Sequence, residues 1–236
     1  MLFKKLRQGV VYTAMTMAAS APLGSAVASE ADPWEGYNRA MFSFNEQVDK
    51  YALKPVAQGY RYIMPDIAET GVSNFFGNLG DVRSAVNSAL QGKGDDALTS
   101  VARIVFNSTF GIAGFIDVAT PMGLEKQREG FGQTLGVWGV GPGPYVVLPL
   151  LGPSTVRDTV GLVPDWNLSP STYVDHVPTR NTLYGLALID ARAQLLEAEK
   201  IISGDKYIFV RDAYLQRREY LIYDGEIPVK YDDSDF

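Results

Sequence analysis

The chain has 236 residues, of which 46% are hydrophobic and 20% charged, and its formal net charge is −6. A globular chain of this length builds one good-sized core, and its acidic balance excludes the basic surface that nucleic-acid binding requires, so nucleic acid is not an expected partner. The sequence contains no cysteine, which excludes disulfides and thiolate metal sites.

The first 28 residues have the features of a secretory signal peptide. Lys4, Lys5 and Arg7 precede an uncharged run, which ends in Ala26-Val27-Ala28. This pattern predicts export with cleavage after Ala28. The alternative is an uncleaved membrane anchor, which the weakly apolar composition of the run disfavours. The mature domain is predicted at residues 29–223, followed by an acidic, flexible tail at residues 224–236.

The mature domain opens with a predicted amphipathic helix. Asp32 is expected as its N-cap and Pro33 as its first residue. Apolar residues then recur every three or four positions, which places them on one stripe of a helix. The stripe comprises Trp34, Tyr37, Met41, Phe44, Val48 and Tyr51. It suits either a protein core or a lipid interface, where aromatic rings and methionine are favoured.

Short helices are predicted for the next part of the chain, because prolines and glycines interrupt its apolar pattern. They span Val56–Met64, Ile67–Phe76, Asp81–Leu90, and a segment ending at Phe106 that Asp95 or Asp96 caps. The apolar continuation at residues 107–117 is expected to be buried or to lie on a membrane surface, and its periodicity does not separate the two. Charged residues at 125–129 predict a solvated loop.

A glycine- and proline-rich stretch from Phe131 to Asp158 follows. It contains six glycines and four prolines, yet no charged side chain lies between Phe131 and Val156. A flexible linker is poor in large apolar residues, whereas this stretch is rich in them, so an ordered apolar loop is predicted. Tyr145–Leu151 is compatible with a strand, but Pro149 argues against a central one. No β-hairpin is predicted.

Two helices are predicted near the C-terminus. Irregular structure is expected for Asp165-Trp166 and for residues 169–180, after which apolar spacings of three and four predict helices over Tyr184–Ile202 and Asp205–Ile222. The short connection between them favours an antiparallel helical hairpin. The fold class is therefore mainly α, a single domain of short amphipathic helices with one Gly/Pro-rich apolar loop.

The residues favour no enzyme. The chain has one histidine, His176, so neither a Ser-His-Asp triad nor a multi-histidine metal site can be assembled. The glycines at 139–143 lack the spacing of a dinucleotide-binding loop, and Ser154 lacks the second glycine of a nucleophile elbow. No catalytic residue, metal site or cofactor is predicted.

Distinctive blocks of sequence follow one another over nearly all of residues 32–220. They are Asp32–Arg39 with Met41–Asn45, Val72–Leu79, Leu90–Gly92, Arg103–Asn107, Gly111–Asp117, Phe131–Asp158, Arg192–Leu196 and Tyr207–Tyr214. Together they resemble the MlaA/VacJ family of outer-membrane phospholipid-transport proteins.

The resemblance implies a mainly helical ring on the periplasmic side of the outer membrane, in its inner leaflet, with an amphipathic channel. Phospholipids misplaced in the outer leaflet would pass through this channel to a periplasmic lipid carrier of the Mla pathway, which maintains lipid asymmetry. Trimeric porins are implied as further partners. The family commonly carries a lipidated cysteine, and because this chain has none, a non-lipidated member is predicted, held by apolar surface, an uncleaved signal or a partner.

A phospholipid channel needs an apolar wall for acyl chains and hydrogen-bonding groups for the headgroup. The candidates for the lipid path come from the first helix and the uncharged stretch: Met41, Phe44, Trp138, Tyr145, Val146 and Leu148. Two other readings stay open, a soluble periplasmic carrier for an apolar ligand and a porin-binding structural protein without a transport role. A hydrolase is a further, less favoured alternative.

Overall fold

The computed structural model describes residues 32–202 and 204–226. The predicted signal peptide and residues 227–236 of the predicted tail lie outside these described residues. As predicted, the fold is mainly helical. The elements are α2 (Glu35–Val48), η1 (Asp49–Leu53), α3 (Lys54–Ile63), α4 (Asp66–Leu90), α5 (Gly94–Thr109), η2 (Thr120–Met122), α6 (Phe131–Val137), β1 (Tyr145–Leu148), β2 (Gly152–Thr155), α7 (Val156–Asn167), η3 (Pro170–Tyr173), α8 (Val177–Gln194), η4 (Ala198–Ile201) and α9 (Lys206–Ile222).

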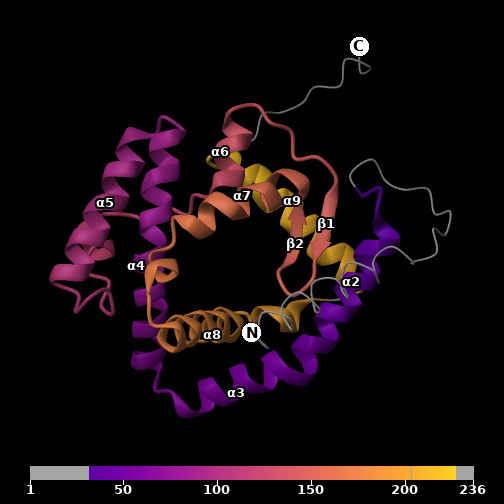
Figure 1. Ribbon diagram of the computed structural model, residues 1–236, viewed down its shortest axis with the longest axis horizontal. Coiled ribbons are helices and arrows are strands. Elements are labelled where there is room, and N and C mark those ends of the chain that lie inside the picture. The colour runs from indigo at the N-terminus through magenta and orange to yellow at the C-terminus, as the bar shows by residue number, and fades with distance from the viewer. Residues whose placement is uncertain (1–31, 203, 227–236) are drawn as a thin grey trace.

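The helices are arranged as a ring (Figure 1). Helices α2 and α3 form one side, α4 forms the next, and α6 with α7 closes the side opposite α3. The hairpin of β1 and β2 stands beside α2, and α8 packs along α3. Helix α5 packs against α4 on the outside of the ring. Segments far apart in the sequence therefore face one another across its inner side.

One continuous helical run from Glu35 to Ile63 forms the first side of the ring. A π-helical turn at Asp49–Leu53 joins α2 to α3, immediately before Pro55 near the start of α3. In a regular α-helix, proline clashes with the carbonyl four residues before it. The wider π turn relieves that crowding. Pro55 therefore does not interrupt the helix, as the sequence had suggested it would.

Asp32 is not the N-cap of the first helix, contrary to prediction. Trp34 occupies the N-cap position, whereas Asp32 is fully buried. Its carboxylate accepts hydrogen bonds from Asn38 Nδ2 at 2.8 Å and from the Tyr207 hydroxyl, and lies 3.5 Å from Arg211 Nη1. The Asp32 carboxylate therefore binds Tyr207 and Arg211 on α9 and does not cap the N-terminus of α2.

Helix α4 runs unbroken from Asp66 to Leu90, where the sequence predicted two shorter helices. A glycine inside a helix costs only about 1 kcal/mol, and packing offsets that cost here. Gly77 lies against Lys126, whose Nζ donates to the Gly77 carbonyl at 2.8 Å. The same Nζ lies 2.8 Å from Asp81 Oδ1, so α4 is held to the following loop.

Helix α5 begins with Lys93 as N-cap, so neither Asp95 nor Asp96 caps it. Both acids instead lie in the first turn, where negative charge is favourable. The helix ends at Thr109, and residues 110–116 form a turn in which Ile112 and Ala113 adopt φ of 51° and 55°. The chain reverses direction at this point because these two residues and Gly114 adopt left-handed backbone angles.

An antiparallel β-hairpin interrupts the helices, which is a correction of the sequence prediction. Strand β1 ends before Pro149, and Pro153 in β2 pairs with Val147. The Val147 N–H points away from β2 and donates to Asn38 Oδ1 at 2.8 Å. Val147 and Pro153 therefore form a pair without mutual hydrogen bonds, so the missing N–H of Pro153 leaves no gap in the ladder.

Asn38 on α2 satisfies the free edge of β1. Its side chain is fully buried. Besides accepting from Val147, its Nδ2 donates to the Tyr145 carbonyl at 3.0 Å and to Asp32. A buried strand edge without such partners would leave backbone groups unsatisfied. The Asn38 side chain thus makes the hydrogen bonds to β1 that a neighbouring third strand would otherwise make.

The two C-terminal helices are present with changed boundaries and packing. Helix α8 begins at Val177, with His176 as its N-cap, and Asp165-Trp166, predicted to be irregular, lie within α7. Helix α9 packs on α6 and β2, so the predicted antiparallel pairing with α8 is wrong. The reason is a cluster of aromatic rings. Two tyrosines of α9 pack against Tyr145 of β1, with ring centroids 6.3 Å away for Tyr207 and 6.2 Å away for Tyr214.

We expect Asn38→Leu to lower the free energy of unfolding by about 2–4 kcal/mol, because it leaves buried donor and acceptor groups on β1 without partners. Urea unfolding of the purified protein, followed by circular dichroism, measures the change. Gln47→Leu, an exposed position on the same helix, is the control and should shift stability by less than about 0.5 kcal/mol. Equal stabilities of the two variants would contradict this role of Asn38.

Candidate functional site

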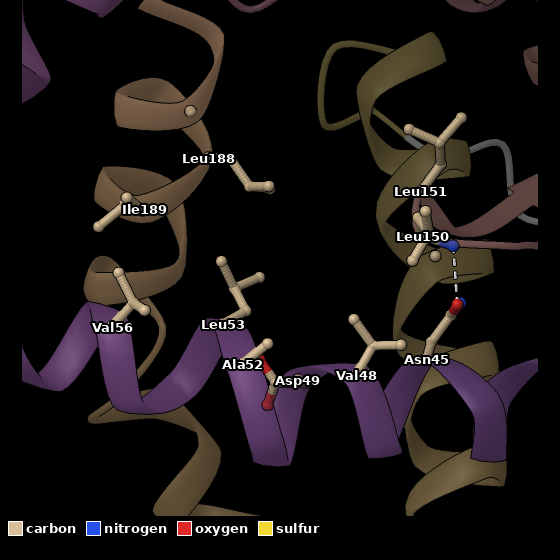
Figure 2. A pocket seen from close by; sticks show the side chains of 12 residues that line it. Asn45, Val48, Asp49, Ala52, Leu53, Val56, Leu150, Leu151, Leu188 and Ile189 are labelled. Atoms are coloured by element: carbon tan, nitrogen blue, oxygen red, sulfur yellow. Dashed lines mark hydrogen bonds between the residues drawn. The ribbon is translucent and has the colours of Figure 1, made fainter. Parts of the chain in front are cut away.

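A cavity of about 550 Å³ lies between α2–η1–α3, the tip of the hairpin and α8. Figure 2 shows side chains from these three segments converging on it. The lining residues are Asn45, Val48, Asp49, Ala52, Leu53, Val56, Leu150, Leu151, Gly152, Gly185, Leu188 and Ile189. Its size is in the range of small-molecule binding sites, roughly 300–1,000 Å³.

The wall of this cavity is mainly aliphatic. In Figure 2, Val48, Leu53 and Leu188 point into the open space. Leu188 remains 53% exposed although it faces the inner side of the ring. Aliphatic side chains left uncovered in a concave site are typical of a site that binds an apolar ligand.

Asp49 is the one charged residue among those lining the cavity, and its charge is paired. Arg192 on α8 binds both carboxylate oxygens, at 2.6 and 2.9 Å, and this hydrogen bonding raises the pKa of Arg192. Arg192 also contacts Glu199, which lies 2.5 Å from Lys54 Nζ on α3. The chain of alternating charges joins α8 and η4 to η1 and α3. It keeps an unpaired charge out of the apolar wall.

Asn45 holds the tip of the hairpin at the edge of the cavity. Its Nδ2 donates to the Leu148 carbonyl at 2.9 Å, and its Oδ1 accepts from the Leu150 N–H at 2.7 Å (Figure 2). Leu150 has a φ of 65°, which is uncommon for a residue other than glycine. Asn38 and Asn45, which lie two helical turns apart on one face of α2, are called the asparagine clamp below.

The six candidate residues from the sequence lie in different places. Tyr145 is fully buried and packs with Tyr207, and Met41 is partly buried against the same cluster. Phe44 is 46% exposed, and Trp138 is 53% exposed with its Nε1 bonded to the Leu90 carbonyl. Val146 is half-buried in β1, and Leu148 lines a second cavity on the other side of the tip. The 550 Å³ cavity is lined by none of the six.

Sequence reasoning missed several cavity residues. Leu150 and Leu151 belong to the uncharged stretch that was singled out, but only the hairpin turn shows that they face α8. Leu188 lies on the apolar stripe that predicts the helix over Tyr184–Ile202, but the spacing does not say what that stripe contacts. The signal was present in both cases, as large apolar residues without a local partner.

The acidic side chains and the single histidine of the described residues form no metal-binding cluster. Within residues 32–202 and 204–226, no three or more His, Cys, Asp and Glu side chains gather as they would around a metal ion. His176 is exposed and bonds Thr179, closing the first turn of α8. Its role is helix capping.

Helices α4 and α5 bury polar residues and expose apolar ones. Buried members on α5 are Ser100, Arg103 and Asn107, and Arg103 Nε lies 3.2 Å from the buried Asp81. The opposite side of α5 and the turn after it form an outer apolar face, defined here as Leu98, Val101, Val105, Phe110 and Ile112, with Leu98 69% exposed. A water-facing helix shows the reverse pattern. None of the described helices combines the length and apolar character needed to cross a bilayer.

A buried ionic network holds α7 to α9 behind the hairpin. Asp158 accepts from Tyr214 at 2.7 Å and from Arg218 Nε and Nη2 at 2.8 and 2.9 Å. Burial raises the pKa of the Asp158 carboxyl, but hydrogen bonding and charge from Arg218, with the Tyr214 hydroxyl and Arg157, outweigh burial and hold that pKa below its usual range. The ionised form is therefore stabilised in the folded protein.

We expect Asp158→Asn to destabilise the protein by about 3–5 kcal/mol at pH 7, because it leaves Arg218 without a buried counter-charge. A depressed folded-state pKa contributes stability that is present above the unfolded pKa of about 3.9 and is lost as pH falls through the folded value. The gap between wild type and variant should therefore close only below about pH 4. Urea unfolding from pH 3 to 7 measures it.

Asp175→Asn is the matched control, since Asp175 is exposed and makes no ion pair with another described residue. Its stability should follow that of the wild type at each pH. A constant gap between wild type and Asp158→Asn down to pH 3 would show that the effect is not ionic.

The fold and the cavity define a class of mainly helical, ring-shaped proteins with an apolar internal cavity and an apolar outer face. The family described as MlaA lipoprotein matches residues 30–221. The chain belongs to this family.

Named relatives extend the comparison. The chain is 38% identical over 230 residues to the intermembrane phospholipid transport system lipoprotein MlaA of Escherichia coli strain K12, covering 94% of this chain and 91% of that protein. It is 34% identical to the Haemophilus influenzae protein of the same name, covering 85% and 83%. A solved structure described as the "structural basis for maintenance of bacterial outer membrane lipid asymmetry" superposes with a TM-score of 0.72 at 38% identity, covering 82% of this chain and all of that one.

Proposed function

We propose that this protein binds phospholipid inside its ring and transports it at the outer membrane, as part of a system that maintains lipid asymmetry. The observation that carries the proposal is the cavity between α3, α8 and the hairpin tip, whose wall is aliphatic and whose Asp49 is neutralised by Arg192. Such a wall suits acyl chains. Relatives named for intermembrane phospholipid transport, similar over almost the whole chain, support the same function.

The outer apolar face supports a position in the membrane. Leu98, Val101 and Val105 are exposed on α5, while the polar side chains of that helix point inward. Exposed apolar surface is unfavourable in water, whereas burying the same surface at the acyl boundary of a bilayer is favourable. This arrangement favours a ring embedded in one leaflet over the alternative of a soluble periplasmic carrier.

The finer steps belong to the same proposal. Phospholipid misplaced in the outer leaflet enters the ring and is handed to a periplasmic lipid carrier, and trimeric porins are partners of the ring in the membrane. The apolar outer face is the membrane attachment of a chain without cysteine. Residues proposed for the path are Met41, Phe44, Trp138, Val146 and Leu148, to which the cavity adds Leu53 and Leu188. Tyr145, the sixth residue proposed from the sequence, is fully buried in the aromatic core and so supports the hairpin instead of touching lipid. Transport needs binding and release, and no bond is made or broken.

Leu188→Asp is expected to abolish transport while leaving the fold intact, because a carboxylate in the aliphatic wall repels acyl chains but the side chain is already half exposed. The measurement is the amount of phospholipid accessible to an externally added phospholipase on cells that carry the variant as their sole copy. It should rise to the level of a deletion strain. Thr182→Asp, on α8 but outside the cavity lining, should behave as wild type.

Normal lipid asymmetry in cells with a stably expressed Leu188→Asp protein would remove the cavity from the transport path. A deletion strain without surface phospholipid would remove the transport function as a whole, and would favour the porin-binding structural alternative.

Membrane extraction separates the embedded ring from the soluble carrier. We expect the protein to stay with outer membranes through a 1 M salt wash, which screens ionic contacts, and to need detergent for release. Val101→Lys with Val105→Lys on the outer apolar face should shift much of it into the salt wash, because charge at a lipid surface is unfavourable. Thr182→Lys is the control. Release of the wild type by salt alone would support the carrier.

A further inference from the structure

A second cavity of about 540 Å³ lies on the other side of the hairpin tip. It is bounded by the side chains of α4, the loop before α6, the hairpin, α7 and α9. Leu151 lines both this cavity and the aliphatic one described above. The two cavities are therefore neighbours, separated by one loop that the asparagine clamp holds.

The second cavity has one apolar part and one cationic part. Leu148, Leu151 and Leu162 provide aliphatic surface. Four arginines from three different segments contribute the cationic part: Arg83, Arg128, Arg217 and Arg218. In a protein of net charge −6, this gathering of cations around one cavity is opposite to the balance of the whole chain.

Three of these arginines lack an ion-pair partner among the described residues. Arg218 is neutralised by Asp158, but Arg83, Arg128 and Arg217 form no ion pair with a described residue. The cations of residues 32–202 and 204–226 that lack such a pair are Lys50, Arg83, Arg128, Arg180 and Arg217. Most of the unpaired positive charge of the described chain therefore borders this cavity.

The carboxylates of the cavity are engaged elsewhere. Glu129 is buried and pairs with Lys93 at 3.3 Å. Asp165 accepts from the Phe131 N–H at 2.9 and 3.1 Å and from Asn87 Nδ2 at 3.2 Å, so it anchors the start of α6 to α4. The charge of Asp165 interacts with that of Arg83 without forming an ion pair, and burial raises the pKa of the Asp165 carboxyl. The three guanidinium groups remain available to a ligand.

We propose that Arg83, Arg128 and Arg217 form a binding site for a phosphate diester anion, the headgroup phosphate of a phospholipid whose acyl chains lie in the neighbouring aliphatic cavity. Guanidinium groups bind phosphate oxygens through paired, charge-assisted hydrogen bonds. The assignment rests on the proposed function and adds which residues select the headgroup. A free phosphate anion has the same chemistry, and the experiment distinguishes the two sources.

The test is calorimetric titration of the full chain, purified in detergent, with three probes. They are a short-chain phosphatidylethanolamine below its micelle-forming concentration, a diacylglycerol with the same acyl chains and no phosphate, and inorganic phosphate. We expect the wild type to bind the phospholipid at least about tenfold more tightly than the diacylglycerol, because the phosphate adds charge-assisted hydrogen bonds, and to bind inorganic phosphate far more weakly than either.

The triple variant Arg83→Gln, Arg128→Gln, Arg217→Gln should lose this preference and bind both lipids with the affinity of the diacylglycerol. All three side chains are exposed, so the variant should unfold at the same urea concentration as the wild type. The control replaces the other two unpaired cations, Lys50→Gln with Arg180→Gln, and should keep the preference.

The outcomes separate the site from the function. Equal binding of both lipids by the wild type, or an unchanged preference in the triple variant, overturns the phosphate site and leaves the transport function standing. Inorganic phosphate binding as tightly as the phospholipid overturns the lipid assignment in favour of a free anion. Failure of both lipids to bind the wild type overturns the site and the proposed function together.

Discussion

The hydrogen bonds from α2 to β1 are the contact on which the inner side of the ring depends. A two-stranded hairpin is marginal by itself, and the free edge of β1 would leave buried backbone groups unpaired. Asn38 and Asn45 satisfy that edge with four hydrogen bonds of 2.7–3.0 Å. Because the clamp also holds the tip between the two cavities, the same bonds that stabilise the hairpin determine where its leucines lie.

The charges of the protein are distributed to leave its apolar surfaces clear. Asp49, Arg192, Glu199 and Lys54 neutralise one another beside the aliphatic cavity, and Arg103 is buried with Asp81 between α4 and α5. With Arg103 paired internally, α5 can present aliphatic side chains outward. The proposed function, a ring in a lipid leaflet that also encloses lipid, needs apolar surface on both sides of its wall, and internal ion pairs make that possible.

Much of the fold was predictable from local pattern, and much of the site was not. The stripe from Trp34 to Tyr51 predicted α2, but the same spacing could not say that Met41 would pack on the core while Phe44 stayed exposed. The absence of charge in residues 131–156 correctly indicated an ordered segment. It did not reveal the hairpin, because the partners of β1 are asparagines more than 100 residues away. The spacing that predicted a helix over Tyr184–Ile202 could not say that Leu188 would line a cavity.

The sequence by itself determined that the fold is mainly helical, that the chain is acidic and lacks cysteine, and to which family it belongs, since periodicity, composition and ordered motifs are local properties. It did not predict α6 or α7, which lie in or beside the Gly/Pro-rich stretch. The tertiary structure decided which apolar residues face inward, which face outward and which arginines go unpaired. These outcomes depend on contacts between distant segments. Asp32 shows the difference most simply, because its position suits a helix cap, whereas Tyr207 and Arg211 of α9 bring it into the core.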